Sequence, residues 1–110
     1  MEDLKARLED EKLEATWHAL RPHGERGVLI WVKKELSISD VGVALAQDQA
    51  GVVEEWLGQG HLVKPSQEQM DQWSEDQRQL FWMLIVQPFV LMQELSEEEE
   101  QAFMQSKLQV

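Results

Sequence analysis

The chain contains no cysteine, few basic residues and no long apolar segment. Without cysteine it has no disulfides, thiolate metal ligands or cysteine nucleophiles, which is compatible with a reducing compartment. The longest apolar run, Leu80 to Val86, has seven residues, whereas a membrane-spanning helix needs about 20. The charged amino-terminal stretch lacks the basic start and apolar stretch of a secretory signal. We therefore expect a cytoplasmic protein that does not enter the membrane.

Basic residues are outnumbered two to one by acidic ones. Ten Lys and Arg stand against 21 Asp and Glu, for a net charge of -11 and an isoelectric point near 4.6. Such a surface repels nucleic-acid phosphates and anionic lipid head groups. The charge predicts no direct nucleic-acid or membrane partner, and it favours a protein with a basic surface.

Length and composition are those of one folded domain. The chain has 110 residues, of which 43% are apolar and 28% charged, a balance typical of soluble globular proteins. This length accommodates one modest hydrophobic core. We expect a single domain over residues 1–110.

The first third of the chain predicts a helix followed by a strand. Apolar residues recur every three to five positions, at Leu4, Leu8, Leu13, Trp17 and Leu20. This spacing predicts one helix over residues 2–20, which Pro22 and Gly24 end. The run Gly27 to Val32 is rich in branched and aromatic side chains, as a buried strand would be.

The middle of the chain predicts two short helices joined by a tight turn. Ser37 and Asp40 have the spacing of a capping box, and the helix they begin breaks near Gln47 and Asp48. A second helix places Val52, Val53, Trp56 and Leu57 on its inward face and ends at the glycines Gly58 and Gly60. A short extended piece over residues 61–64 follows.

The last third predicts a helix, a long strand and a terminal helix. Ser66 and Gln69 form a second capping-box pattern, which opens a polar helix ending near Asp76. Residues 80–93 are long enough for a helix, which stays open as an alternative, but Pro88 lies inside the run and the composition favours one buried strand that bends or bulges there. Ser96 caps a last helix, which contains the acidic turn 97–100 and then Phe103, Met104, Lys107 and Leu108.

This order of elements predicts an α+β, winged-helix-like fold. It reads helix, strand, helix-turn-helix, wing strands with a helical insertion, and C-terminal helix. In a winged helix, the second helix ends at glycine and the chain re-enters as the first wing strand. We expect strands around Leu62 and Val86 to join residues 27–32 in one sheet.

The chain also resembles a family of small bacterial proteins. The residues that carry the resemblance are Thr16, Trp17, Leu20, Pro22, His23, Arg26, Gly27, Val41, Ala44, Asp48, Val52, Trp56, Leu57, Gly60, Leu62, Trp73, Val86, Pro88, Phe89, Val90, Leu91 and Gln93. Together they resemble domain-of-unknown-function family 2288 over residues 12–93. The resemblance implies a bacterial, cytoplasmic protein and transfers no functional residues.

The outward face of the second middle helix is the main candidate site. Gly51, Glu54, Glu55 and Gly58 lie there, with Asp48 at the start of the helix and Asp40 on the helix before. Base and phosphate contacts come mainly from Arg, Lys, Asn, Gln and small hydroxyls, and no basic residue occurs between Lys34 and Lys64. The face therefore favours a basic protein partner over DNA, and the alternative is an acidic face that only contacts solvent.

Five tryptophans are present, and four of them fall on expected core faces. These four are Trp17, Trp31, Trp56 and Trp82. Trp73 follows a polar stretch, and we expect it to be partly exposed, either anchoring an interface or covering the core.

No residue pattern of high specificity indicates catalysis, a cofactor or a metal. Glu14 and His18 share one face of the expected first helix, where they would offer two metal ligands, but a surface hydrogen bond is the commoner role of such a pair. We expect no catalytic residues, no cofactor and no metal site.

The sequence is thus interpreted as a non-catalytic, acidic protein-interaction module, with a homodimer left open. Two alternatives remain: a nucleic-acid-associated regulator that acts through a partner, and an enzyme of unknown chemistry.

Overall fold

The computed structural model describes residues 3–76, 79–96, 98–99 and 101–102. The elements are α1 (Asp3–Glu11), β1 (Leu13–Thr16), α2 (Trp17–Glu25), β2 (Leu29–Val32), α3 (Ile38–Ala46), α4 (Ala50–Gln59), β3 (Leu62–Val63), α5 (Gln67–Glu75), β4 (Leu80–Val86) and β5 (Phe89–Glu94). None of these helices is long and apolar enough to cross a membrane.

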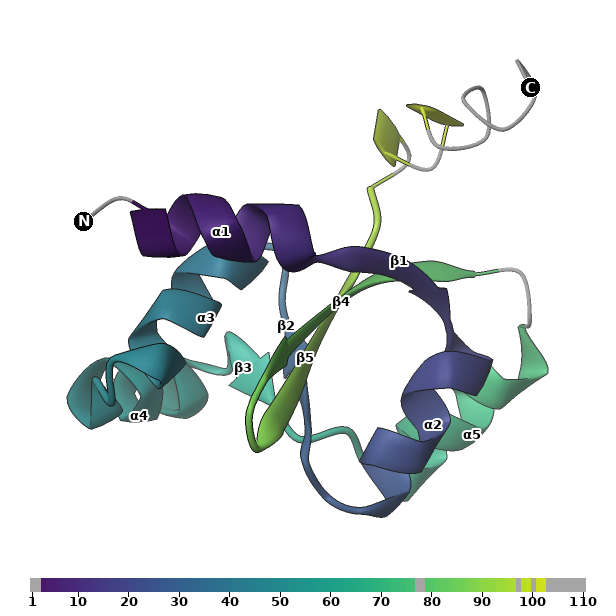
Figure 1. Ribbon diagram of the computed structural model, residues 1–110. Coiled ribbons are helices and arrows are strands. Elements are labelled where there is room, and N and C mark those ends of the chain that lie inside the picture. The colour runs from purple at the N-terminus through teal and green to yellow at the C-terminus, as the bar shows by residue number, and fades with distance from the viewer. Residues whose placement is uncertain (1–2, 77–78, 97, 100, 103–110) are drawn as a thin grey trace.

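The five strands form one mixed sheet with helices on both faces. Its order is β1-β4-β5-β2-β3, and only the central β2–β5 pair is parallel. Helices α1, α3 and α4 lie on one side of the sheet, and α2 and α5 lie on the other (Figure 1). The α+β class expected from the sequence is confirmed.

Side chains alternate between two hydrophobic clusters, one on each face of the sheet. In β2, Ile30 and Val32 pack towards α1 and α3, whereas Leu29 packs towards α2 and α5. Alternation is the normal geometry of a strand, and burial of both faces explains why the run reads as almost continuously apolar. The expected strand is confirmed over residues 29–32, and the expected start at Gly27 is wrong, because Gly27 lies in the turn before the strand.

The single helix expected over residues 2–20 is wrong. The chain leaves the helical conformation after Glu11, and β1 then runs as a strand into α2. Leu8 and Leu13 are five residues apart, a spacing that departs from the helical repeat, and Leu13 and Ala15 instead alternate as in a strand. The expected stop is also wrong, because Pro22 and Gly24 lie inside α2 and the left-handed residue is Gly27, with φ of 76°.

The two middle helices begin and end where the sequence predicts. α4 ends at Gly60, which adopts φ of 79° and donates its N–H to the carbonyl of Leu57. The expected side-chain cap of α3 is not formed, since the Ser37 hydroxyl lies 2.9 Å from that of Ser39 and Asp40 pairs with Lys5. The α5 cap is confirmed, because Ser66 Oγ accepts the N–H of Gln69 at 3.1 Å.

Residues 80–93 form two strands, not the one bent strand expected. Gln87 and Pro88 make a tight turn with a cis peptide bond, and β4 then pairs antiparallel with β5 from Val86↔Phe89 onwards. A proline in a tight turn avoids the ladder hydrogen bond it cannot donate. The apolar run is long because it is a hairpin at the centre of the sheet.

The expected sheet is confirmed, but the wing of a winged helix is not formed among the described strands. β2, β3 and β4 share one sheet, as predicted, yet β3 pairs with β2, and β4 pairs with β1 and β5. A wing requires β3 and β4 to be hairpin partners, and here β5 and β2 separate them. The physical reason is that β5 forms a hairpin with β4 and lies parallel to β2, taking the central position in the sheet.

The cap of the last expected helix is present. The N–H of Glu99 donates to Ser96 Oγ at 3.1 Å, and Glu99 Oε1 accepts the N–H of Ser96 at 2.8 Å. Phe103, Met104, Lys107 and Leu108 lie outside the described residues.

Candidate functional site

Helix α4 is attached to the outside of the domain. None of its residues is buried, although α3, the helix before it, buries five. Val53 and Trp56 are half-buried against the core. The predicted inward positions Val52 and Leu57 are instead 40% and 47% exposed. This expectation is wrong because the main contacts of α4 are with α3 and the two-residue strand β3, and these leave Val52 and Leu57 largely uncovered.

A groove lies between the α3–α4 turn and the β4–β5 hairpin, with a volume of about 460 Å³. Its apolar lining comes from Ala44, Leu45, Ala50, Val53 and Phe89, and its polar lining from Asp48, Gln49 and Glu54. The sequence did not indicate Phe89, because its position beside α3 and α4 depends on the hairpin turn at Pro88. The signal was present in that proline, which was interpreted as a bend.

The carboxylates at the groove have no cationic neighbour. Among the described residues, Asp48, Glu54 and Glu55 form no salt bridge, and Glu55 accepts only an amide hydrogen bond from Gln59 at 3.3 Å. Asp48 sits in the α3–α4 turn with φ of 55°, a conformation that Asp tolerates better than most residues. The groove therefore combines an apolar lining with uncompensated negative charge.

The other predicted site residues lie in three places: on the exposed side of α4, at the start of α3, and in the core beneath α5. Gly51, Glu55 and Gly58 are exposed on α4 but are not part of the groove lining. Asp40 lies at the start of α3, and its carboxylate is 2.8 Å from Lys5 of α1, a contact that raises the pKa of Lys5. This ion pair neutralises Asp40 and separates it from the α4 acids.

Trp73 is not on the surface, and its expected partial exposure is wrong. It is 4% exposed and lies between α5 and the sheet, with its ring 5.1 Å from that of Trp17, 4.9 Å from Trp31 and 5.6 Å from Phe81. Of its two expected roles, covering the core is the one observed. Trp17 is buried as predicted, whereas Trp31, Trp56 and Trp82 are only partly buried.

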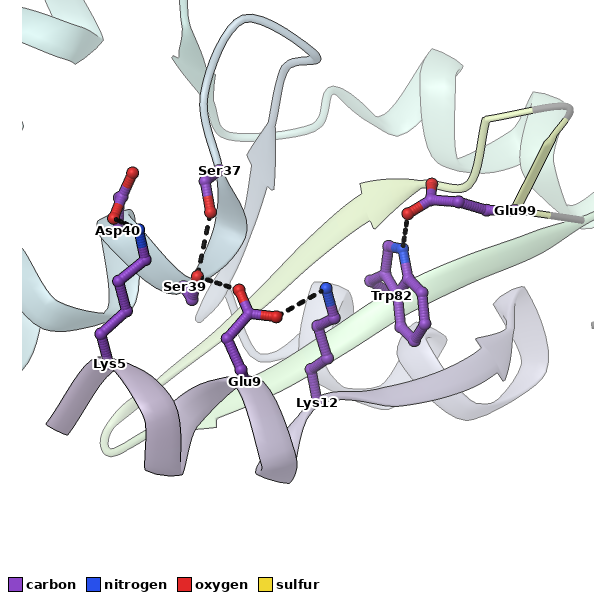
Figure 2. Close-up of polar contacts among 8 residues, drawn as sticks. All are labelled: Lys5, Glu9, Lys12, Ser37, Ser39, Asp40, Trp82 and Glu99. Atoms are coloured by element: carbon purple, nitrogen blue, oxygen red, sulfur yellow. Dashed lines mark hydrogen bonds and ion pairs between the residues drawn. The ribbon is translucent and has the colours of Figure 1, made fainter. Parts of the chain in front are cut away.

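A second polar cluster joins α1 to α3, and the sequence analysis missed it (Figure 2). The Ser39 hydroxyl is completely buried and donates to Oε2 of Glu9, while Lys12 Nζ lies 3.2 Å from Oε1. The bond from Ser39 lowers the pKa of the Glu9 carboxyl below its usual range; burial opposes this shift and Lys12 adds to it. Because a substrate cannot reach a fully enclosed hydroxyl, the cluster serves to hold α1 against α3.

The histidines do not converge on one place. Glu14 lies in β1 and His18 in α2, so the shared helix face expected for them is wrong. His61 Nδ1 is 3.4 Å from Glu35, and His23 Nδ1 accepts from Arg26 at 2.6 Å. Burial, with Arg26, lowers the pKa of His23. Within the described ranges, no group of three His, Asp or Glu side chains is placed to hold a metal ion.

A shallow cavity of about 270 Å³ opens between α2 and α5, beside Thr16, His18, Arg21 and Ser74. Three of its polar side chains, Trp17, Ser74 and Arg21, contact neighbouring groups. Trp17 Nε1 donates to Ser74 Oγ at 2.8 Å, Ser74 donates to the Met70 carbonyl, and Arg21 pairs with Glu25 at 3.1 Å. The bond from Trp17 to Ser74 joins α2 to α5, and the other two contacts lie within a single helix.

Comparison with known proteins agrees with the resemblance noted from the sequence. The fold is similar to the NMR solution structure of PA1075 from Pseudomonas aeruginosa, with a TM-score of 0.73, 32% identity, and coverage of 89% of this chain and 90% of that chain. No curated protein matches the chain. The family model described as "Protein of unknown function (DUF2288)" matches residues 3–94. The chain therefore belongs to this family.

Proposed function

We propose that the protein is a non-catalytic interaction module whose groove beside α4 binds an amphipathic, basic segment of a partner protein. The observation that carries this proposal is the state of α4, which has no buried residue and exposes Val52 and Leu57. Exposed apolar side chains beside a concave apolar surface are a recurrent feature of protein-interaction sites.

Charge selects the chemistry of the partner. Asp48 and Glu54 line the groove and Glu55 follows Glu54 on α4, all without cationic partners in the described structure. A segment with apolar residues at helical spacing would place them in such a groove, and Lys or Arg on its flanks would meet these carboxylates. The same charges oppose a nucleic acid, whose phosphates they would repel.

A pair of designed peptides tests the proposal directly. One peptide carries leucines at helical spacing flanked by lysines, and its control replaces every lysine by glutamate. Each peptide is titrated into the isotope-labelled protein and followed by NMR. We expect the lysine peptide to shift the backbone amide resonances of Ala44, Val53 and Phe89. The glutamate peptide should leave them in place, and duplex DNA at low salt should not bind.

Two matched double variants distinguish binding at this groove from non-specific attraction to the net negative charge of the chain. Glu54→Lys with Glu55→Lys should abolish binding of the lysine peptide, whereas Glu68→Lys with Glu75→Lys changes the charge equally on α5 and should leave it nearly intact. Binding should weaken as the screening length falls to about 8 Å near physiological ionic strength. Equal binding by both double variants would show that the groove is not the site.

The native partner is sought with the same pair of variants. Proteins captured from the native cytoplasm by the parent and by the α5 variant, but lost with the α4 variant, are the candidates. A captured protein that binds the α4 variant as tightly as the parent would contradict the proposed site.

A further inference from the structure

We propose that residues 103–110 of one copy of this chain bind, as a helix, in the groove beside α4 of a second copy, which returns the same contact. This inference rests on the proposed function, because it names the segment that occupies the same groove. Its support is the place where the chain leaves the sheet, the residues that follow, and the charge of the groove. Two such reciprocal contacts close a two-fold dimer in which both grooves are filled.

The segment is attached to the sheet at Glu99. Trp82 Nε1 donates to Glu99 Oε2 at 3.1 Å, and the Lys12 ammonium lies 4.4 Å from the centre of the same ring (Figure 2). Ser96 and Glu99 form a reciprocal capping box, and residues 98–99 and 101–102 are helical. A helix that begins at Ser96 therefore leads towards residue 103 from a fixed point on β4.

The residues after Glu100 have the character that the groove requires. Residues 101–110 contain no acidic residue, one lysine and five apolar residues. On a helix, positions i, i+1, i+4 and i+5 share one face, and here they are Phe103, Met104, Lys107 and Leu108. Gln105 and Gln109 occupy the opposite face. The segment thus has one apolar and basic face and one neutral polar face.

The charges of this segment and of the groove are complementary. Asp48 and Glu54 line the groove without a cationic partner in the described structure. Lys107 precedes Leu108 in the sequence, so a helix that places Leu108 against the apolar lining brings the lysine towards these carboxylates. Opposite charges around an apolar contact fix its register and disfavour other partners.

The groove of the same copy is out of reach of this helix. A helix over residues 99–110 is about 17 Å long. The strand from Trp82 to Val86, the partner of Phe89, already spans about 13 Å. Both α1 and α3 pack over this stretch, and a path around a helix roughly 10 Å across exceeds the remaining length. Figure 1 shows residues 98–99 and 101–102 at the opposite end of the domain from α4. The segment therefore enters the groove of another copy.

A spin label tests the exchange directly. The chain has no cysteine, so Gln105→Cys offers one attachment site, on the helix face away from the groove. Spin-labelled protein is mixed with isotope-labelled parent protein at roughly 1 mM, where even a weak complex forms. We expect the amide resonances of Ala44, Val53 and Phe89 to broaden in the isotope-labelled copies. Absence of broadening in this mixture would overturn the proposal, as would broadening only when both labels are on the same molecule.

Matched variants of the full chain test the apolar face of the segment. Phe103→Ser with Leu108→Ser removes two apolar side chains from that face, whereas Gln105→Ser with Gln109→Ser changes the opposite face. In sedimentation equilibrium, we expect the first variant to dimerise at least about tenfold more weakly than the parent and the second to match the parent. Circular dichroism checks that both variants fold. Equal dimerisation by the two variants would overturn the proposal.

A charge exchange tests the position of Lys107. Lys107→Glu places a carboxylate beside Asp48 and Glu54 and should weaken the dimer several-fold. Adding Glu54→Lys to the same chain restores an opposite-charge contact, and we expect it to recover part of the loss. A double variant that dimerises as weakly as Lys107→Glu alone would overturn the placement of Lys107 in the groove.

The designed lysine peptide separates failure of this inference from failure of the proposed function. Where residues 103–110 occupy half of the grooves, the peptide should bind the variant with Phe103→Ser and Leu108→Ser about twofold more tightly than the parent. Equal binding to both, with the groove resonances still shifted, would overturn the self-association and leave the groove as a site for another protein. A peptide that shifts none of the groove resonances in either protein would contradict the proposed function as well.

Discussion

The two faces of the sheet are closed in different ways. On one face, the polar helix α5 buries a single residue, Trp73, whose ring meets Trp17, Trp31 and Phe81. On the other face, α3 buries five residues among aliphatic neighbours, and α4 is added outside it with none. On the first face α5 thus contributes one large buried aromatic side chain, whereas on the other face α3 contributes several buried residues and α4 leaves apolar side chains exposed.

This difference separates the buried Trp73, which we expect to stabilise the fold, from α4, where we propose that a partner binds. A helix held by one buried residue cannot also offer that residue to a partner, which is why Trp73 is excluded as an interface anchor. A helix with no buried residue leaves its apolar side chains exposed and available for contact, which is why α4 is the proposed binding surface.

The largest expected effect comes from removing the aromatic centre. Trp73→Ala should lower the free energy of unfolding by about 3 to 5 kcal/mol, because it leaves a cavity where three rings meet and detaches α5. Urea denaturation followed by circular dichroism measures it. Trp73→Phe keeps part of the packing and should cost less; a loss below about 1 kcal/mol for the alanine variant would show that α5 is held by other contacts.

Removing the Trp56 side chain, on the opposite face of the sheet, should lower the free energy of unfolding by less. Trp56 is only half-buried, so Trp56→Ala should cost about 1 to 3 kcal/mol, less than the loss in Trp73→Ala. The same denaturation series measures both variants. An equal or larger loss for Trp56 would mean that α4 is as firmly anchored as α5 and would weaken its assignment as a binding surface.

The polar cluster between α1 and α3 should contribute a comparable or smaller amount. Ser39→Ala removes the hydroxyl that donates to Glu9 and should cost about 1 to 3 kcal/mol, since a partly buried carboxylate then loses a hydrogen bond. Ser66→Ala, which removes an exposed helix cap on α5, provides a comparison outside the cluster. If the free energy of unfolding depended on pH equally in the parent and in Ser39→Ala, the Ser39 hydroxyl would not lower the pKa of Glu9.

This contribution should depend on pH in a defined direction. The folded state lowers the pKa of Glu9 below its ordinary value of 4.5, so the folded state binds this proton more weakly than the unfolded chain. The stabilisation is therefore fully present above pH 4.5 and is lost as pH falls through the folded-state pKa. Glu9→Gln and Ser39→Ala should both flatten this part of the stability profile, measured by urea denaturation at a series of acidic pH values.

The smallest change in stability is expected from substituting two helical glycines, one on the exposed helix α4 and one on the buried helix α3. A Cβ added at Gly51 of α4 meets nothing within 4 Å, so Gly51→Ala should raise stability by up to about 1 kcal/mol through helix propensity. At Gly42 of α3, a Cβ would lie 3.0 Å from Leu84 and 3.1 Å from Leu8. Gly42→Ala should therefore gain less than Gly51→Ala in thermal unfolding, and the reverse order would contradict the packing described for α3.

Much of the local structure was predictable because its causes are local. The glycine at the end of α4, the serine cap of α5 and the branched residues of β2 all act on their immediate neighbours. The errors occurred where one residue type suits two structures. Leu13 extends an apparent helical stripe and also begins an alternating strand, and only its pairing with Met83 decides between them.

The candidate site was predictable in charge and not in shape. The run without basic residues between Lys34 and Lys64 located the acidic surface. The groove was missed, because Phe89 reaches it through a hairpin whose turn was interpreted as a bend in one strand. The ion pair of Asp40 with Lys5 was also missed, because Lys5 lies on a helix 35 positions away in the chain, counting from residue 5 to residue 40.

By itself, the sequence determined the α+β class, the acidic surface, and the ends of α3, α4 and α5, since charge is additive and helix ends depend on a few adjacent residues. The tertiary structure decided which strands are neighbours, that Trp73 is enclosed and that α4 is left largely uncovered. These features depend on contacts between distant segments, such as β1 with β4 and β2 with β5. Each strand edge pairs with one neighbour, so one pairing excludes another: β4 pairs with β5, and a hairpin between β3 and β4 therefore cannot form. Which pairing forms is decided only when the whole sheet assembles.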